Sequence, residues 1–149
     1  MPEKETIERA RKDKEEGKAP STQAGEFVRE EMEHIREGKH GARSAKQAVA
    51  IGLSKARRAG VKLPPPAKGK TSGRTRKQAK RDLRKPRSSR KHKPSRTRSR
   101  AVKKALKREP RSAASHRALS RQAHAAARKR SAADRSRAAK KAAATRKRK

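Results

Sequence analysis

The sequence predicts an all-α protein made of a short helical hairpin and a long, largely disordered basic tail, whose Ala/Arg/Lys-rich end is a conditional helix. Three observations predict this class. Residues 21–63 hold two amphipathic segments separated by glycines, the chain has one aromatic residue, and its net charge is +35. With only 28% hydrophobic residues, the chain is not expected to bury one large core, and most of it should lie outside the compact globular class.

Charge is distributed unevenly along the chain. Residues 1–40 contain nine Lys/Arg against eleven Asp/Glu, residues 41–63 contain six against none, and residues 64–149 contain thirty-four against three. A polycationic tail of this size repels itself unless a polyanion neutralises it. The sequence therefore predicts a polyanionic partner.

The first segment, residues 1–20, has helix-forming composition and mixed charge. Ile7 and Ala10 are almost its only apolar residues. With no apolar face to bury, residues 3–16 are expected to form a frayed or transient helix.

The second segment, residues 21–63, is expected to form the hairpin. One helix begins at Ser21 or Thr22 and ends near Glu37, before the glycines at 38 and 41, and "GKHGAR" connects it to the next. Apolar residues recur at helical spacing along one side of each helix. The expected hairpin core consists of Val28, Met32, Ile35, Val49, Leu53 and Ala56.

The second helix of the hairpin is expected over residues 45–59. Ser44 and Gln47 have the spacing of a capping box, and Gly60 followed by Val61 is typical of a helix stop in the left-handed conformation. Ile51 lies opposite the apolar side of this helix. A lone hairpin leaves it in water, and the alternative is a second contact surface, to a second copy of the chain or to the first helix.

The remaining residues are expected to form a linker and a tail. Pro64, Pro65 and Pro66 end the hairpin, and residues 64–100 consist mostly of Pro, Ser, Lys and Arg, which predicts a disordered linker. Residues 101–149 are rich in alanine and basic residues. Repulsion between cations four residues apart opposes a helix there, so helicity is expected to depend on a neutralising partner.

Nucleic acid is the polyanion that this composition favours. Lys and Arg at high density bind phosphates tightly and without base discrimination, because binding releases condensed counterions. The preferred partner is duplex DNA, which predicts a nucleoid-associated, cytoplasmic protein. The expected nucleic-acid-binding residues are Lys46, Lys55, Arg57, Arg58, Lys68, Lys70, Arg74, Arg76, Lys77, Arg81, Arg84, Arg87, Arg90, Arg96, Arg98, Arg100, Lys103, Lys104, Arg117, Arg121, Arg128, Lys129, Arg130, Arg135, Arg137, Lys140, Lys141, Arg146 and Arg148.

Other functional classes have little support in the sequence. No nucleophile elbow or phosphate-binding glycine motif occurs, so neither an enzyme, a cofactor nor a small-molecule substrate is predicted. His34 and Glu37 have a spacing that suits metal ligands, but the sequence shows no third ligand, so no metal site is predicted. Membrane binding is not expected, because the basic tail lacks the large apolar residues that insert into lipid.

Residues 26–66 resemble a family of small basic bacterial proteins whose domain has no assigned function. The resemblance is carried by "GKHG" and "KQAVAIGLSKARRAG", and it implies no catalytic residues. The tail, with "AAKKAAATRKRK", is similar in composition to bacterial histone-like proteins and to linker-histone tails. Together these resemblances imply a nucleoid-associated protein.

Two other functions remain open at this point. An RNA- or ribosome-associated protein would carry the same basic extension. An interaction adaptor would dock a protein on the hairpin and use the tail to hold the complex on nucleic acid. A homodimer formed through the hairpin is also left open.

Overall fold

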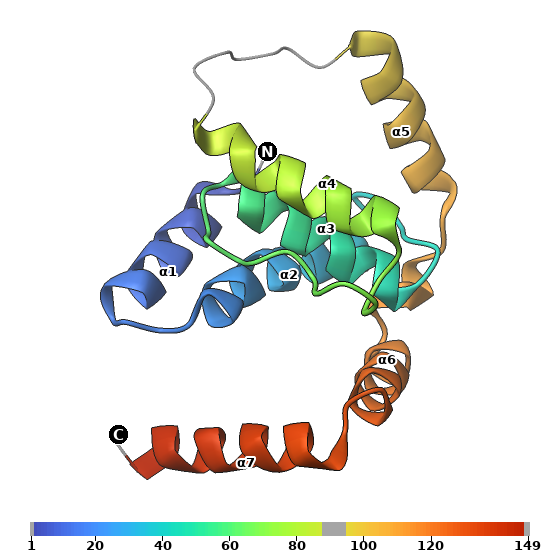
Figure 1. Cartoon of the computed structure of the whole chain (residues 1–149). Coiled ribbons are helices and arrows are strands. Elements are labelled where there is room, and N and C mark those ends of the chain that lie inside the picture. The colour runs from blue at the N-terminus through green and yellow to red at the C-terminus, as the bar shows by residue number, and fades with distance from the viewer. Residues whose placement is uncertain (1, 88–94, 148–149) are drawn as a thin grey trace.

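Seven α-helices and two short 3₁₀ helices make up the described chain (Figure 1). The computed structural model describes residues 2–87 and 95–147. In chain order the elements are α1 (Lys4–Glu15), α2 (Pro20–Arg36), α3 (Ala45–Arg58), α4 (Gly73–Arg84), η1 (Lys85–Arg87), α5 (Arg96–Arg108), η2 (Arg111–Ala114), α6 (His116–Arg128) and α7 (Ala132–Lys147). Helix α3 is central, because it contacts α2, α4 and α6.

Helices α2 and α3 form the hairpin; α3 begins at the expected residue and ends one residue before the expected one. The Ser44 hydroxyl accepts a hydrogen bond from the backbone N–H of Gln47 at 3.3 Å. At the other end Gly60 has φ 102°, and the backbone N–H of Val61 donates to the Ala56 carbonyl at 3.1 Å. These contacts satisfy backbone groups that a helix end otherwise leaves without partners.

The hairpin is tightly packed at Gly52. A Cβ atom at this position would lie 2.7 Å from the Cα of Val28 and 3.0 Å from the carbonyl oxygen of Phe27. Only glycine therefore allows α2 and α3 to approach this closely.

Two hydrophobic clusters form the core, and together they contain all six residues of the expected hairpin core. The first joins Met32, Ile35 and Ala48 to Ala113 and Ala114, with partly buried residues around them. The second is built around Phe27, which is 1% exposed. The expected apolar side of α2 omitted this aromatic side chain, which is the largest fully buried one among the described residues.

Helix α1 packs against α2, although the sequence predicts a frayed helix there. Thr6, Ala10 and Asp13 are buried, and Arg9 forms an ion pair with Glu26 at 2.8 Å. The contact surface is mainly polar, so an apolar pattern could not reveal it.

The prediction of a short hairpin followed by a long, largely disordered tail is wrong. Four α-helices and two 3₁₀ helices occupy the described part of residues 64–149. Ser72, Ser95 and Ser115 cap α4, α5 and α6 through their hydroxyl oxygens. Each cap stabilises its helix by about 1 kcal/mol, which offsets a few pairs of like charges at about 0.2–0.5 kcal/mol each.

The Asp82 side chain links α4 to α3 through a hydrogen bond. It is 1% exposed and accepts hydrogen bonds from the Ser54 hydroxyl and from the Gln78 side-chain amide. Arg58 lies 3.6 Å away. Ile51 is one turn before Ser54 on the same side of α3 and is half-buried.

We expect Asp82→Ala to release α4 from α3, because the half-buried Ser54 hydroxyl and the Gln78 amide then lose their charged acceptor. Hydrogen bonds to a charged group contribute about 1.5–3 kcal/mol. Limited trypsin digestion should therefore cleave within α4 about tenfold faster. Asp134→Ala is the matched control, since the Asp134 carboxylate accepts hydrogen bonds from Ser131 and Arg137, which both lie outside α4. Equal cleavage of α4 in both variants would contradict the role given to Asp82.

Residues 106–114 lie against the turn that joins α2 to α3. The backbone N–H of Gly41 donates to the Leu106 carbonyl at 2.8 Å, and that of Ala42 donates to the Pro110 carbonyl at 3.2 Å. A Cβ at Gly41 would lie 1.8 Å from the carbonyl oxygen of Glu109. The basic half of the chain is thus docked on the hairpin by backbone contacts.

Helices α5 and α7 bury none of their described residues, and both project from the helices around α3 (Figure 1). Helix α7 begins with the Ser131 hydroxyl accepting the backbone N–H of Asp134 at 3.1 Å. Within the described ranges, no helix has the length and apolar character needed to cross a bilayer.

Candidate nucleic-acid interface

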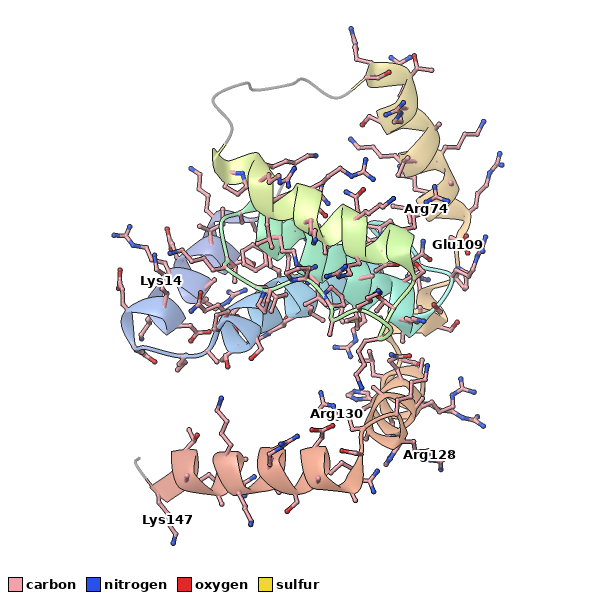
Figure 2. The ribbon with its side chains drawn as sticks, viewed as in Figure 1. Lys14, Arg74, Glu109, Arg128, Arg130 and Lys147 are labelled. Carbon is pink, nitrogen blue, oxygen red and sulfur yellow. The ribbon has the colours of Figure 1, made fainter. Side chains whose placement is uncertain are left out.

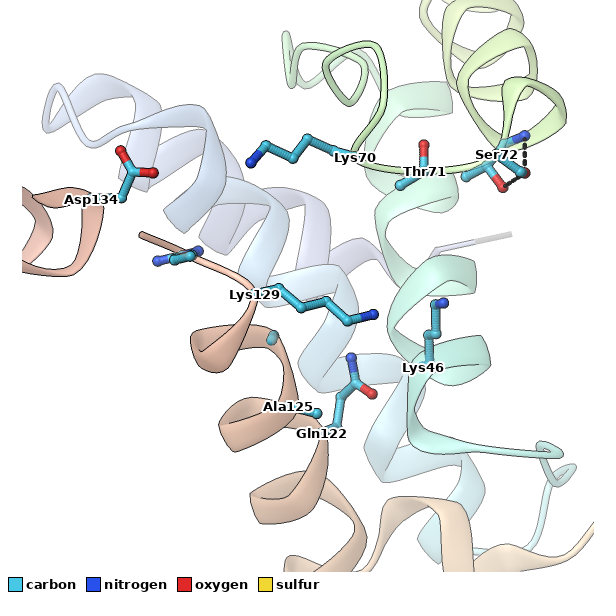
Figure 3. A pocket seen from close by; sticks show the side chains of 11 residues that line it. Lys46, Lys70, Thr71, Ser72, Gln122, Ala125, Lys129 and Asp134 are labelled. Atoms are coloured by element: carbon cyan, nitrogen blue, oxygen red, sulfur yellow. Dashed lines mark hydrogen bonds between the residues drawn. The ribbon is translucent and has the colours of Figure 1, made fainter. Parts of the chain in front are cut away.

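A basic groove runs between the N-terminal end of α3, the segment before α4, and α6. Its wider part is a pocket of about 660 Å³ lined by Lys46, Lys70, Lys129 and Arg130, among others. Figure 3 shows Lys46, Lys70 and Lys129 projecting from three separate segments around this hollow. Residues far apart in the sequence therefore supply one cationic surface.

A second pocket of about 490 Å³ continues the groove along α6. It shares Lys46 and Gln122 with the first pocket. The basic groove is defined here by the cations of both pockets, which are Arg43, Lys46, Lys70, Arg117, Arg121, Lys129 and Arg130.

Three helices begin at the groove. Ser44 of α3 and Ser115 of α6 line its narrower part, and Ser72 of α4 lines its wider part. Each serine is the N-cap of its helix. Free backbone N–H groups and the positive end of the helix dipole make such ends attractive to anions.

Each of these three helices has a cation as its second residue, in the patterns Ser44-Ala-Lys46, Ser72-Gly-Arg74 and Ser115-His-Arg117. None of the three has an acid in its first turn. A cation next to a helix N-terminus is unfavourable for the isolated helix. The same placement is favourable once an anion binds, because the cation and the N–H groups then both face negative charge.

The groove is strongly positive. Asp134 is the acidic residue that lines it, and hydrogen bonds from Arg137 and Ser131 hold the pKa of this carboxyl below its ordinary value. Basic side chains also project from α5, α6 and α7 (Figure 2). The arrangement suits an extended ligand with many negative charges.

Most of the predicted cations lie where a ligand could reach them. Six of the seven groove residues belong to the predicted set, with Arg43 as the exception. Outside the groove, the exposed members of that set are Arg58, Lys68, Arg74, Lys77, Arg81, Arg84, Arg96, Arg98, Arg100, Lys103, Lys104, Arg128, Arg135, Arg137, Lys140, Lys141 and Arg146. The Arg87 side chain, Arg90 and Arg148 lie outside the part of the chain that the structure describes.

Three other predicted cations are not exposed, and two of them form contacts within the protein. Lys55 is 18% exposed and lies between the carboxylates of Glu30 and Glu31. Arg57 is buried and donates to the carbonyls of Leu63 and Pro64 at 3.2 and 3.3 Å. Arg76 is half-buried. Lys55 and Arg57 are therefore not expected to contact a ligand, because their charged groups already contact carboxylates or carbonyls within the protein.

The sequence interpretation missed Arg43. It lies directly before the capping Ser44, and its side chain is 83% exposed. Its position directly before a helix N-cap could have indicated a ligand-binding residue, but charge alone does not distinguish Arg43 from the many other cations.

The comparisons with known proteins concern the N-terminal half. No curated protein and no solved structure shows significant similarity to the chain. A family model does match part of the chain. The matched region includes α1, α2 and α3 and ends after the three prolines, so most of the groove's cations lie beyond it. It also begins earlier than the resemblance noted from the sequence. A DUF6496 domain, from a family of unknown function, covers residues 4–68, less than half of this chain.

Proposed function

We propose that this protein binds nucleic acid through the phosphate backbone, without reading base sequence, and that duplex DNA is its preferred partner. The observation that carries the proposal is the basic groove, where seven cations surround the N-termini of three helices. Backbone N–H groups and basic side chains are the usual partners of phosphate oxygens.

The composition argues against recognition of unpaired bases. Single-stranded nucleic acid is usually held by aromatic side chains on which bases stack. The single aromatic residue, Phe27, is buried in the core. The ligand is therefore expected to keep its bases paired and to present its phosphates.

Helices α5 and α7 extend the cationic surface beyond the groove. Their basic residues are exposed, and the net charge of the chain is +35. A protein of this charge attracts any nucleic acid at a distance, and the groove then fixes how it is held. We place the protein on the bacterial nucleoid as part of the same proposal.

Salt titration of binding tests the proposal. If the seven groove cations contact phosphates, log K should fall with log salt at a slope of about −6, and contacts from α5 and α7 should steepen it further. Affinity should change little among duplexes of different base sequence. A slope near −2, or strong preference for one sequence, would contradict backbone binding.

The same titration should include a duplex RNA of equal length. Duplex DNA should bind more tightly, since it is the preferred partner in the proposal. Tighter binding to the RNA would keep the phosphate-binding groove but assign it to an RNA-associated function.

A further inference from the structure

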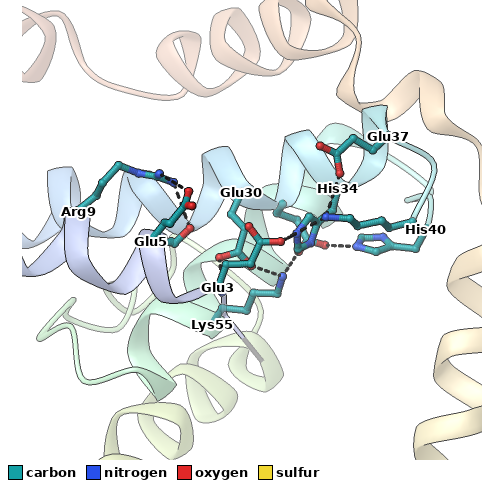
Figure 4. Close-up of polar contacts among 11 residues, drawn as sticks. Glu3, Glu5, Arg9, Glu30, His34, Glu37, His40 and Lys55 are labelled. Carbon is teal, nitrogen blue, oxygen red and sulfur yellow. Dashed lines mark hydrogen bonds and ion pairs between the residues drawn. The ribbon is translucent and has the colours of Figure 1, made fainter.

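A cluster of ionisable side chains lies away from the basic groove, where α1, α2 and the turn after α2 meet (Figure 4). Glu31, His34 and His40 each offer one ligand atom, and these atoms lie within 4.8 Å of one another. Glu31 and His34 are one turn apart on α2, and His40 comes from the turn. This combination of one carboxylate and two imidazoles is common at transition-metal sites.

Glu31 is an unusual buried carboxylate. The residue is 0% exposed, and neither of its oxygens has a hydrogen-bond partner. Lys55 Nζ lies 2.6 Å from Oε2, and His40 Nε2 lies 3.4 Å from Oε1, but neither contact has hydrogen-bond geometry. A buried charge without such partners is costly, so an additional positive ligand would stabilise it.

Lys55 is shared between two buried carboxylates. Its Nζ also contacts Glu30, at 3.1 Å. Glu30 accepts a further hydrogen bond from the Glu3 backbone N–H at 3.1 Å, whereas the Glu31 oxygens have no hydrogen-bond partner. Glu31 is therefore the carboxylate of the pair that still needs a partner.

Both histidines already have the second contact that metal-bound histidines usually make. His34 Nε2 lies 2.7 Å from Glu3 Oε1, and His40 Nδ1 lies 3.1 Å from the Gly41 carbonyl oxygen. A proton on each of these nitrogens leaves the other ring nitrogen free to bind a metal. The second contacts thus orient both rings for this purpose.

We propose that Glu31, His34 and His40 bind one divalent transition-metal ion, with Zn²⁺ as the expected metal. Glu31 offers Oε1, while Oε2 stays next to Lys55. His40 offers Nε2 and His34 offers Nδ1, which leaves a fourth position for water. The ion supplies the partner that the buried Glu31 oxygens lack.

The expected consequence is structural. His40 precedes Gly41 and Ala42, whose backbone N–H groups hold residues 106–110. A metal bound to His40 would therefore fix the turn on which the basic half of the chain docks.

Titration of the full chain, without a polyhistidine tag, with Co²⁺ tests the proposal. We expect one Co²⁺ per chain, a visible absorption band typical of four or five ligands, and displacement by Zn²⁺. The positive net charge repels divalent cations, so background binding should be low. His40→Gln should weaken Co²⁺ binding at least tenfold, and the exposed His124→Gln should leave it unchanged.

Two further measurements keep the test decisive if His40→Gln does not fold. Zn²⁺ should raise the melting temperature of the unaltered protein in proportion to log concentration. Glu3→Gln should weaken binding about tenfold or more, because it removes the carboxylate that orients His34. The absence of saturable Co²⁺ binding, or equal affinity in the His40 and His124 variants, would overturn the proposal.

Discussion

Replacing Lys46, Arg121 and Lys129 together by alanine is expected to weaken duplex DNA binding about 500-fold at 0.1 M salt. The three residues are exposed and lie along the whole basic groove. Each phosphate contact contributes about 0.9 to the salt slope, which corresponds to a factor of about eight at this salt concentration. The slope itself should become less steep by about 3. A mobility-shift titration at several salt concentrations measures both quantities.

The matched control removes three exposed cations from α1, namely Lys4, Lys12 and Lys14. It changes the net charge equally but leaves the groove intact. We expect this variant to lose only the small part of the affinity that depends on overall charge. Equal losses in the two variants would mean that net charge, and not the groove, determines binding.

Gly52→Leu is expected to separate α2 from α3 and to destabilise the protein by about 3 kcal/mol or more. The Cβ alone would lie 2.7 Å from the Val28 backbone, and a backbone atom cannot move aside as a side chain can. Overpacking of a core typically costs about 1–3 kcal/mol, and here the two central helices must shift. Thermal unfolding followed by circular dichroism should show a melting temperature lower by about 6–12 °C.

Gly25→Leu makes the same chemical change on α2 at a position where a Cβ meets nothing within 4 Å. Leucine favours helix over glycine by roughly 0.5–1 kcal/mol, so this variant should be slightly more stable. The same glycine-to-leucine substitution is therefore expected to lower the stability of the protein at position 52 and to raise it at position 25. A stable Gly52→Leu protein would show that the helices do not pack as described.

The hairpin could be predicted because its signals are local. Ser44 with Gln47 and Gly60 with Val61 each act within a few residues of the helix end that they define. The six expected core residues repeat at helical spacing and face one another across α2 and α3. Local sequence is sufficient for features of this kind.

The fold of the basic part of the chain, residues 64–149, could not be predicted from the sequence. It depends on a few contacts between residues far apart in the chain, and the composition of this part is nearly uniform. Only three acids follow Glu37, namely Asp82, Glu109 and Asp134. The Asp82 side chain links α4 to α3, the Glu109 side chain lies 4.0 Å from Arg43, and Asp134 helps to cap α7. The average composition of the linker and tail does not show what these individual residues contact, so disorder was predicted for both segments.

The candidate site was predictable in kind but not in arrangement. The density of Lys and Arg predicts phosphate binding, yet it assigns the same role to Lys55, which lies next to two buried carboxylates, and to Lys46, which lines the groove. Distinguishing them requires the position of Glu30 and Glu31 one helix away. The groove itself exists only because α6 folds back against α3.

Amide hydrogen exchange of the full chain, with and without duplex DNA, tests the central claim most directly. We expect the first-turn amides of α3, α4 and α6 to gain protection on binding, because they face the bound phosphates. Amides of α1 should exchange at the same rate in both states. Protection confined to α5 and α7, with no change at the three helix starts, would contradict the assignment of nucleic-acid binding to the groove.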